Sequence, residues 1–238
     1  MKIPKFTLED KIAVVTGAAR GIGREIALVF AHSGAHLILV DLLKEELMKT
    51  TKEIDGIGRR SLSIAADISN TKEIERLVTD ILNKFNRIDI LVNNAGVIDN
   101  NPATEVTEEQ WDKTLNVNLK GLFFLSQAVG RHMIKERRGK IINIASQAGV
   151  IALENHAAYS ASKAGIISIT KTLALEWGKF NINVNAIAPT VILTPLGKKA
   201  WADPQIRSEM LKKIPLELIR RIGPQGGICI GSSSEVHD

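Results

Sequence analysis

A tyrosine and a lysine four residues apart are the pair of side chains in this chain best suited to proton transfer. Tyr159 is the only tyrosine among the 238 residues, and Lys163 follows it within the segment 157–163. At this spacing both side chains lie on one face of a helix. A nearby ammonium favours phenolate and lowers the phenol pKa from about 10. We therefore expect Tyr159 to act as a general acid or base, with a buried tyrosine beside a solvated lysine as the alternative.

A glycine-rich turn follows the first apolar run of the chain, residues 12–16. Gly17, Gly21 and Gly23 stand where this run passes into a helical pattern. Gly17 permits a tight turn, and the missing Cβ atoms of the other two let a pyrophosphate approach the backbone. The start of the helix offers free N–H groups and a positive dipole end. In this context the spacing predicts a dinucleotide-binding loop, with a glycine-rich turn that binds nothing as the alternative.

Acidic residues follow the second and third apolar runs. Asp41, 18 positions after Gly23, can accept hydrogen bonds from both hydroxyls of an adenosine ribose and would repel a 2′-phosphate. It therefore favours NAD over NADP. Arg20 can offset this repulsion, or its side chain can simply be solvated. Asp67 can accept a hydrogen bond from the adenine amino group, or it can cap the following helix.

Apolar runs and helical patterns alternate along the chain. We expect strands at 12–16, 36–40, 61–66, 89–92, 140–145 and 183–188, and helices at 25–32, 44–54, 70–85, 108–135 and 156–177. Glu73 is placed to close a capping box on Asn70. Strands separated by single helices indicate a parallel sheet covered on both faces. The expected fold is α/β, a doubly wound Rossmann-like sheet in one domain over residues 1–238.

The amino-acid composition limits the classes of binding partner that we expect for this protein. The chain has 31 basic and 26 acidic residues, a net charge of +5, spread along helical segments. This pattern indicates solvated faces rather than a nucleic-acid stripe. No apolar stretch reaches about 18 residues, the start is polar, and Cys229 is the single cysteine. We expect a cytoplasmic protein with a small-molecule substrate, no nucleic acid, no membrane and no metal.

Together with the turn at 93–96 (Asn-Asn-Ala-Gly), these motifs resemble the classical short-chain dehydrogenase/reductase family over roughly residues 8–216. The resemblance implies a catalytic tetrad of Asn118, Ser146, Tyr159 and Lys163. Ser146 has the family's spacing of thirteen residues before the tyrosine. It would hold the substrate oxygen and stabilise the alkoxide-like charge. Lys163 can also bind the nicotinamide ribose, and the Asn118 carbonyl can hold a water that links Lys163 to solvent.

The same resemblance implies a set of cofactor contacts, which extends from the glycine turn to the segment after the sixth strand. Ile192 and Thr194 match the positions that hold the nicotinamide carboxamide. The implied cofactor-binding residues are Gly17, Arg20, Gly21, Ile22, Gly23, Asp41, Asp67, Ile68, Asn94, Ala95, Gly96, Tyr159, Lys163, Pro189, Ile192 and Thr194.

A narrower resemblance, to xylulose reductases and related polyol dehydrogenases, concerns the substrate. It implies polar contacts for a polyhydroxylated molecule, because an unmatched buried polar group is costly. The implied substrate-binding residues are Ser146, Gln147, Asn155, His156, Tyr159 and Trp201. Trp201 would close a lid at about 190–214. A surface histidine at a helix start and ordinary packing of the tryptophan are the alternatives.

The last segment, 217–238, departs from the family pattern. Glycines and prolines crowd positions 223–231, which leaves too short an apolar run for the usual final strand. We expect that strand to be missing, which bears on the homo-oligomer, a tetramer or dimer, that the resemblance implies. The favoured function is NAD-dependent interconversion of a secondary alcohol, such as a polyol, and its ketone. The alternatives are a non-catalytic or assembly-impaired NAD-binding protein and a reductase of acyl-carrier or steroid ketones.

Overall fold

The computed structural model of the chain describes residues 7–190, 192, 203–205, 208 and 212. The chain divides into two units, Met1–Thr190 and Val191–Asp238. The fold and the site described below belong to the first unit. Most of the predicted lid and all of the tail at 217–238, with the missing final strand, lie outside the described residues. The single domain over 1–238 stays a prediction.

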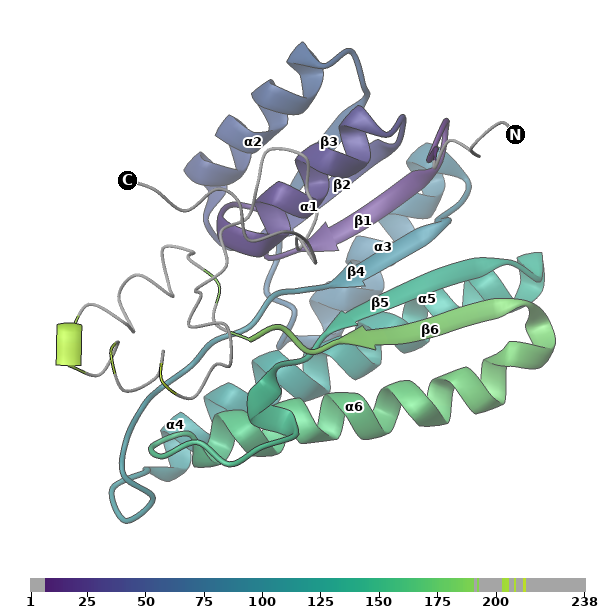
Figure 1. The fold of residues 1–238 in the computed structure, drawn as a ribbon. Helices are drawn as coiled ribbons and strands as arrows, with labels where there is room; N and C mark the ends of the chain where they lie inside the picture. The colour runs from purple at the N-terminus through teal and green to yellow at the C-terminus, as the bar shows by residue number, and fades with distance from the viewer. Residues whose placement is uncertain (1–6, 191, 193–202, 206–207, 209–211, 213–238) are drawn as a thin grey trace, which may run out of the picture. The chain divides into compact units, whose positions relative to one another are not determined.

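The first unit is built on one parallel sheet, which confirms the predicted fold class (Figure 1). Its strands lie in the order β3-β2-β1-β4-β5-β6. They are β1 (Ile12–Thr16), β2 (His36–Asp41), β3 (Ser61–Ala65), β4 (Ile90–Asn93), β5 (Gly139–Ile144) and β6 (Ile182–Ile187). The chain moves outward from β1 in both directions, so a crevice opens at the carboxyl ends of β1 and β4, where such sheets bind ligands.

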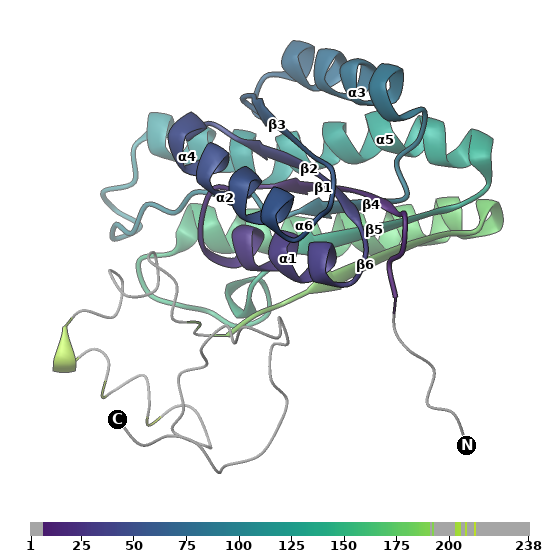
Figure 2. The same cartoon turned by 90° about the horizontal axis from the view of Figure 1, so that it is seen from above.

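Helices cover both faces of the sheet, and Figure 2 shows α1 and α3 on opposite sides. The helices are α1 (Gly21–His32), α2 (Lys44–Gly56), α3 (Thr71–Phe85), α4 (Glu108–Leu115), α5 (Leu122–Glu136) and α6 (Ala157–Trp177). Side chains of β1 alternate between two apolar cores. Ile12 and Val14 pack in the core with α3, α5 and α6, and Ala13 and Val15 in the core with α1 and α2. Burial on both faces explains the unbroken apolar run.

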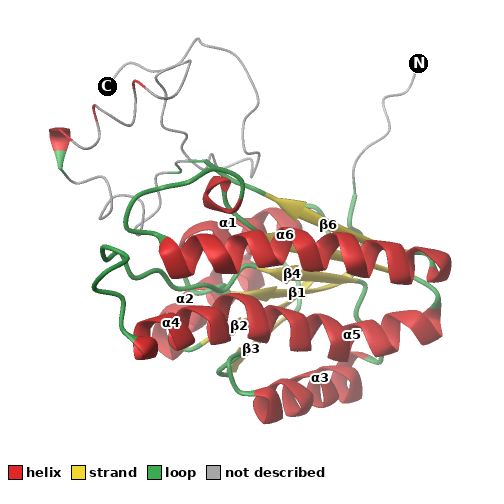
Figure 3. Ribbon diagram, turned by 90° about the horizontal axis from the view of Figure 1, so that it is seen from below, coloured by secondary structure: helices red, strands yellow, loops and turns green. Residues whose placement is uncertain are grey.

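The helix predicted over 108–135 is interrupted. Thr107 caps α4 through a capping box with Gln110, and a π-helical turn, Asn116–Gly121, then separates α4 from α5. π-helical turns inside α-helices are often found at functional sites. After this turn, α5 runs alongside α6, as Figure 3 shows.

Two further expectations about helix starts are wrong. The helix α1 begins at Gly21, four residues earlier than expected, so its first turn coincides with the glycine turn. Glu73 does not close a capping box on Asn70, because its carboxylate accepts hydrogen bonds from the Asp67 N–H and the Asn70 side-chain amide. Asn70 still caps α3, accepting from the Lys72 N–H. Among the described residues, no helix is long and apolar enough to span a membrane.

Candidate active site

The predicted catalytic residues come from three neighbouring elements. Asn118 lies in the π-helical turn, Ser146 stands two residues after the carboxyl end of β5, and Tyr159 and Lys163 lie in the first two turns of α6. The π-helical turn packs against α6. The structure therefore brings the four positions to one end of the sheet, beside the crevice.

The Ser146 hydroxyl lies near enough to the Tyr159 phenol to influence its pKa. Burial raises the pKa of Tyr159 above its ordinary value of 10, and the neighbouring Ser146 hydroxyl offsets part of that rise. The Ser146 oxygen accepts the Ala148 N–H at 3.2 Å, which leaves its proton free for donation. This hydroxyl is therefore placed to donate to a negative oxygen beside the phenol.

Lys163 is buried, with 4% of its surface exposed. Its Nζ donates to the Ile144 carbonyl at 2.7 Å and lies 5.5 Å from the centre of the Tyr159 ring. Burial lowers the pKa of Lys163 to about 8. The expectation that Lys163 lowers the pKa of Tyr159 is not met here, because burial outweighs the other influences on the phenol and the Lys163 ammonium is bound to a carbonyl of β5.

Asn118 is fully buried, and its side chain is used entirely inside the protein. The side-chain oxygen accepts the Val97 N–H at 2.8 Å, and the amide donates to the Val97 carbonyl at 2.9 Å and to the Ser162 hydroxyl at 3.1 Å. Ser162 in turn donates to the Tyr159 carbonyl at 2.7 Å. Asn118 thus ties the loop that leaves the Asn-Asn-Ala-Gly turn to Ser162 of α6, and only its backbone is left for a ligand.

The glycine turn fits a dinucleotide pyrophosphate. Gly17 and Gly21 have φ angles of 66° and 59°, which side chains rarely adopt. A Cβ on Gly23 would lie 2.2 Å from the Gly17 carbonyl oxygen, so the turn closes only with glycine. Arg20 is exposed and gives no side-chain cap to α1. The uncapped N–H groups of this first turn suit a phosphate.

Asp41 is held against the glycine turn. One carboxylate oxygen accepts the Ala19 N–H at 3.0 Å, and the other accepts the Leu43 N–H at 3.1 Å. Each oxygen keeps a lone pair, so the carboxylate can still accept two hydroxyl donors. The residue therefore fits the ribose contact predicted for it.

The Asn-Asn-Ala-Gly turn is bound to the glycine turn on one side. The Thr16 hydroxyl oxygen accepts the N–H groups of Asn94 and Ala95 at 3.0 and 3.1 Å. The Asn94 amide donates to the carbonyls of Thr16 and Gly17 at 3.0 and 3.2 Å. These bonds fix the two turns that border the crevice relative to each other.

On its other side the same turn begins a series of hydrogen bonds between buried polar side chains, which runs across the sheet. The Asn93 amide donates to the Ser126 hydroxyl and to the Asn143 side-chain oxygen, both at 2.8 Å. Asn143 donates in turn to the Thr170 hydroxyl at 2.9 Å. These hydrogen bonds join β4 and β5 to α5 and α6, and so hold α6, the helix that carries Tyr159, to the centre of the sheet.

The structure places only some of the predicted substrate-binding residues beside Tyr159 and Ser146. The His156 ring precedes α6 and packs edge-on against the Tyr159 ring, 6.0 Å between centres. The Gln147 N–H donates to the Pro189 carbonyl at 3.0 Å, and Asn155 is exposed with a φ of 61°. Trp201 lies outside the described residues.

The remaining predicted cofactor-binding residues that the structure describes show no contact that supports or opposes their predicted role. Asp67 accepts the Ser69 N–H in a local turn, Ile68 is buried beside it, and Gly96 is exposed as the last residue of the Asn-Asn-Ala-Gly turn. Ile192 is described within the second unit, and Thr194 lies outside the described residues. Over the described ranges, no group of three or more His, Cys, Asp and Glu side chains could hold a metal ion.

The positioning groups that sequence reasoning missed include the Thr16 hydroxyl, the Ser162 hydroxyl and the Asn143 amide. Each stands where a polar residue interrupts an apolar or small-residue segment next to a predicted motif. That interruption is the signal that could have identified them, because a buried polar side chain must find partners.

The fold and the site define an α/β protein with a glycine turn of the dinucleotide-binding type, and with a tyrosine, a serine and a lysine gathered at the same end of the sheet. Residues 11–205 match the family described as short chain dehydrogenase. The chain belongs to the short-chain dehydrogenase/reductase family, an oxidoreductase family that uses nicotinamide cofactors to interconvert alcohols and ketones.

The chain is 50% identical to the NAD-dependent glycerol dehydrogenase of Listeria innocua over 210 residues, which cover 88% of this chain and 81% of that protein. It is 44% identical to the D-threitol dehydrogenase of Mycolicibacterium smegmatis, with 88% and 80% covered. Its fold matches a crystal structure of NAD+-bound xylitol dehydrogenase with a TM-score of 0.87 at 31% identity, over 92% of this chain and 89% of that one. These similarities confirm the resemblance to polyol dehydrogenases.

Proposed function

We propose that the protein is an NAD(H)-dependent oxidoreductase that interconverts a secondary alcohol of a polyol and its ketone, with Tyr159 as the acid/base. The observation that carries this proposal is the placement of Tyr159, Ser146 and Lys163 together at one end of the sheet, with the buried Lys163 Nζ 5.5 Å from the centre of the Tyr159 ring. A substrate oxygen that contacts both hydroxyl groups would meet a proton acceptor and a hydrogen-bond donor together.

Tyr159, Ser146 and the cofactor-binding groups have different roles in the proposed reaction. In oxidation, the Tyr159 phenolate takes the hydroxyl proton of the substrate, while Ser146 donates a hydrogen bond to the same oxygen. In reduction, the phenol returns that proton. The nicotinamide supplies the hydride chemistry when bound. The glycine turn, Asp41 and Asn94 are the groups that would hold it.

Two observations support NAD as the cofactor. Asp41 presents a carboxylate beside the glycine turn, and among the described residues no lysine or arginine forms an ion pair with it. A carboxylate in that position disfavours a 2′-phosphate. The glycerol dehydrogenase relative is itself named NAD-dependent.

The substrate class rests on the relatives and on the polar rim of the site. The glycerol and threitol dehydrogenases are named for small polyols. Gln147 adjoins Ser146, and the His156 ring packs against Tyr159. These polar side chains suit a substrate with several hydroxyl groups.

The test compares Tyr159→Phe with Ser160→Ala, a matched change one position along α6 at a hydroxyl that has no partner among the described residues. Initial rates are measured at 340 nm with glycerol, threitol, xylitol and a 3-oxoacyl thioester, each with NAD(H) and NADP(H). We expect Tyr159→Phe to lower kcat by about 10³-fold with NAD binding unchanged, and Ser160→Ala to keep the wild-type rate. Substantial turnover by Tyr159→Phe, or a preference for NADP(H) or the thioester, would overturn the proposal.

A further inference from the structure

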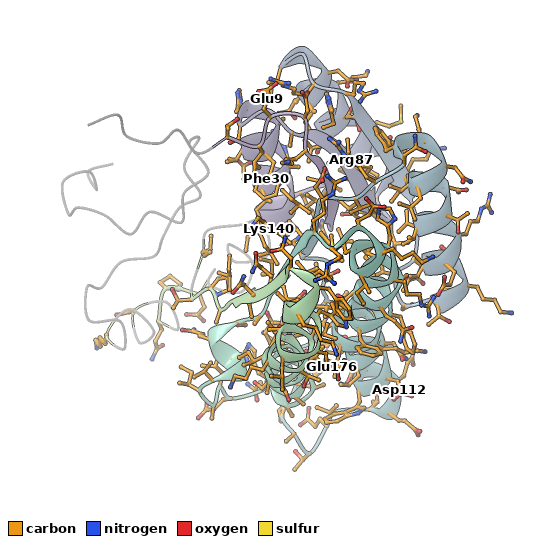
Figure 4. All side chains as sticks on the ribbon, turned by 90° about the vertical axis from the view of Figure 1, so that its right-hand side faces the viewer. Glu9, Phe30, Arg87, Asp112, Lys140 and Glu176 are labelled. Atoms are coloured by element: carbon orange, nitrogen blue, oxygen red, sulfur yellow. The ribbon has the colours of Figure 1, made fainter. Side chains whose placement is uncertain are left out.

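A basic pocket opens at the opposite end of the sheet from the active site, where the strands begin. Its cavity is about 450 Å³, and its side chains include His36, Arg60, Phe85, Arg87 and Arg138. His36 starts β2, and Arg60 and Arg138 directly precede β3 and β5. Figure 4 looks onto this face and labels Arg87. Five residues of β1, roughly 15 Å of strand, separate it from the glycine turn.

The charges of the pocket are unbalanced. Three arginines line it, and Asp10 is the one carboxylate among its described lining residues. Arg87 is engaged within the protein: its Nε lies 3.1 Å from the Asp89 carboxylate, an ion pair without hydrogen-bond geometry, and its guanidinium donates to the Asp10 carbonyl. Arg138 has a solvent-exposed pair with Glu136 at 3.7 Å, a type of contact that contributes little.

Arg60 is the least compensated of the three. Among the described residues no carboxylate lies within ion-pair distance of it, and its guanidinium lies 5.7 Å from the centre of the Phe85 ring. Guanidinium groups left without a carboxylate bind phosphate and carboxylate oxygens in a bidentate manner.

His36 adds a neutral donor to the pocket. Burial, and next the Arg60 charge, lower the pKa of His36, so its imidazole is neutral at pH 7. Its Nδ1 accepts the Arg60 N–H at 3.2 Å, which places the proton on Nε2. Nε2 lies 3.6 Å from the Asp10 carboxylate, beyond ordinary hydrogen-bond length, so the donor remains available to a ligand oxygen.

We propose that the basic pocket binds a phosphorylated small molecule through its phosphate group, at a site separate from the active site. The phosphate lies between the Arg60 and Arg138 guanidiniums and accepts from His36, and the rest of the molecule packs on the Phe85 ring. The cavity is within the usual size range for small-molecule sites. This site does not depend on the proposed function, because it shares no residue with it.

The experiment is calorimetric titration of the full chain with phenyl phosphate and with inorganic phosphate, in saturating NAD so that the glycine turn does not bind the probe. The test variant is Arg60→Gln with Arg138→Gln, both exposed positions, so that Arg87 and its buried partner stay intact. The control is Arg76→Gln with Arg131→Gln, which removes the same two charges from ion-paired surface positions on α3 and α5.

We expect the test variant to lose affinity for both probes by about 10-fold for each guanidinium removed, and the control to stay within about 2-fold of wild type. Tighter binding of phenyl phosphate would identify an organic phosphate as the ligand class, and equal binding would identify inorganic phosphate. Both support the site. Equal losses in the two double variants, or no binding by wild type at millimolar phosphate, would overturn the proposal.

Discussion

Replacing Lys163 by methionine should make the protein more stable near neutral pH while stopping the reaction. Lys163 is 4% exposed, and burial alone lowers its pKa from 10.5 to about 8. Because the folded-state pKa lies below the unfolded one, the penalty for burying the ammonium is complete below about pH 8 and disappears as the pH rises to 10.5. At pH 7 this penalty is about 3 kcal/mol.

The substitution also removes a favourable bond. The Lys163 ammonium donates to the Ile144 carbonyl at 2.7 Å, and losing that bond costs about 1–2 kcal/mol. The variant should therefore exceed the wild type by about 1–2 kcal/mol in the free energy of unfolding at pH 7. Between pH 7 and 9.5 the wild type alone should gain about 2 kcal/mol from this group, so the advantage of the variant should vanish at pH 9.5.

Urea unfolding at both pH values, followed by circular dichroism, measures these differences. Lys171→Met, at an exposed position of the same helix, controls for the substitution itself. A Lys163→Met protein that is less stable than wild type at pH 7, with the same dependence on pH, would refute the reasoning. It would mean that the ammonium gains more from the β5 carbonyl than it loses on burial.

Three other predictions test the parts that hold the site together. Asp41→Ala should weaken NAD binding by about 10-fold or more and improve NADP binding, measured by fluorescence titration; unchanged NAD affinity would contradict the ribose contact. Asn143→Ala should lower the free energy of unfolding by about 2–4 kcal/mol, because it leaves buried Asn93 and Thr170 groups unpaired; a smaller loss in urea titration would mean that water replaces the amide. Gly23→Ala should abolish cofactor binding with the sheet still folded, because its Cβ would lie 2.2 Å from a carbonyl oxygen; tight NAD binding by the folded variant would contradict this.

The sheet could be predicted from the sequence because strands buried on both faces leave unbroken apolar runs. β1 shows the reason: each of its residues faces one of two cores, so none needs to be polar. Helix ends were harder to place. The glycine turn and the first turn of α1 share residues, and the sequence does not separate a loop glycine from a helical one.

The site was predictable in its residue types and less so in its bonds. Tyr159, Lys163 and Ser146 carry their signal in spacing, and the structure brings them to one end of the sheet. The partner of Lys163 is a backbone carbonyl of Ile144, and every residue has such a carbonyl, so no sequence pattern marks it. The π-helical turn around Asn118 packs against α6, a contact that the sequence pattern did not predict.

The directions in which the pKa values of Tyr159 and Lys163 are shifted predict how the rate of the proposed reaction should depend on pH. Burial opposes charge on both Tyr159 and Lys163, raising one pKa and lowering the other, so the unliganded protein favours a neutral phenol. Oxidation needs the phenolate, so the oxidation rate should rise with pH until Tyr159 is deprotonated, and the reduction rate should fall over the same interval. The Ser146 hydroxyl counteracts the effect of burial on the Tyr159 pKa, because it stabilises a negative oxygen. Ser146→Ala should therefore move the midpoint of the oxidation profile to higher pH. Profiles of kcat/KM that coincide for wild type and Ser146→Ala would remove Ser146 from the tuning of the phenol and leave it only the substrate oxygen to bind.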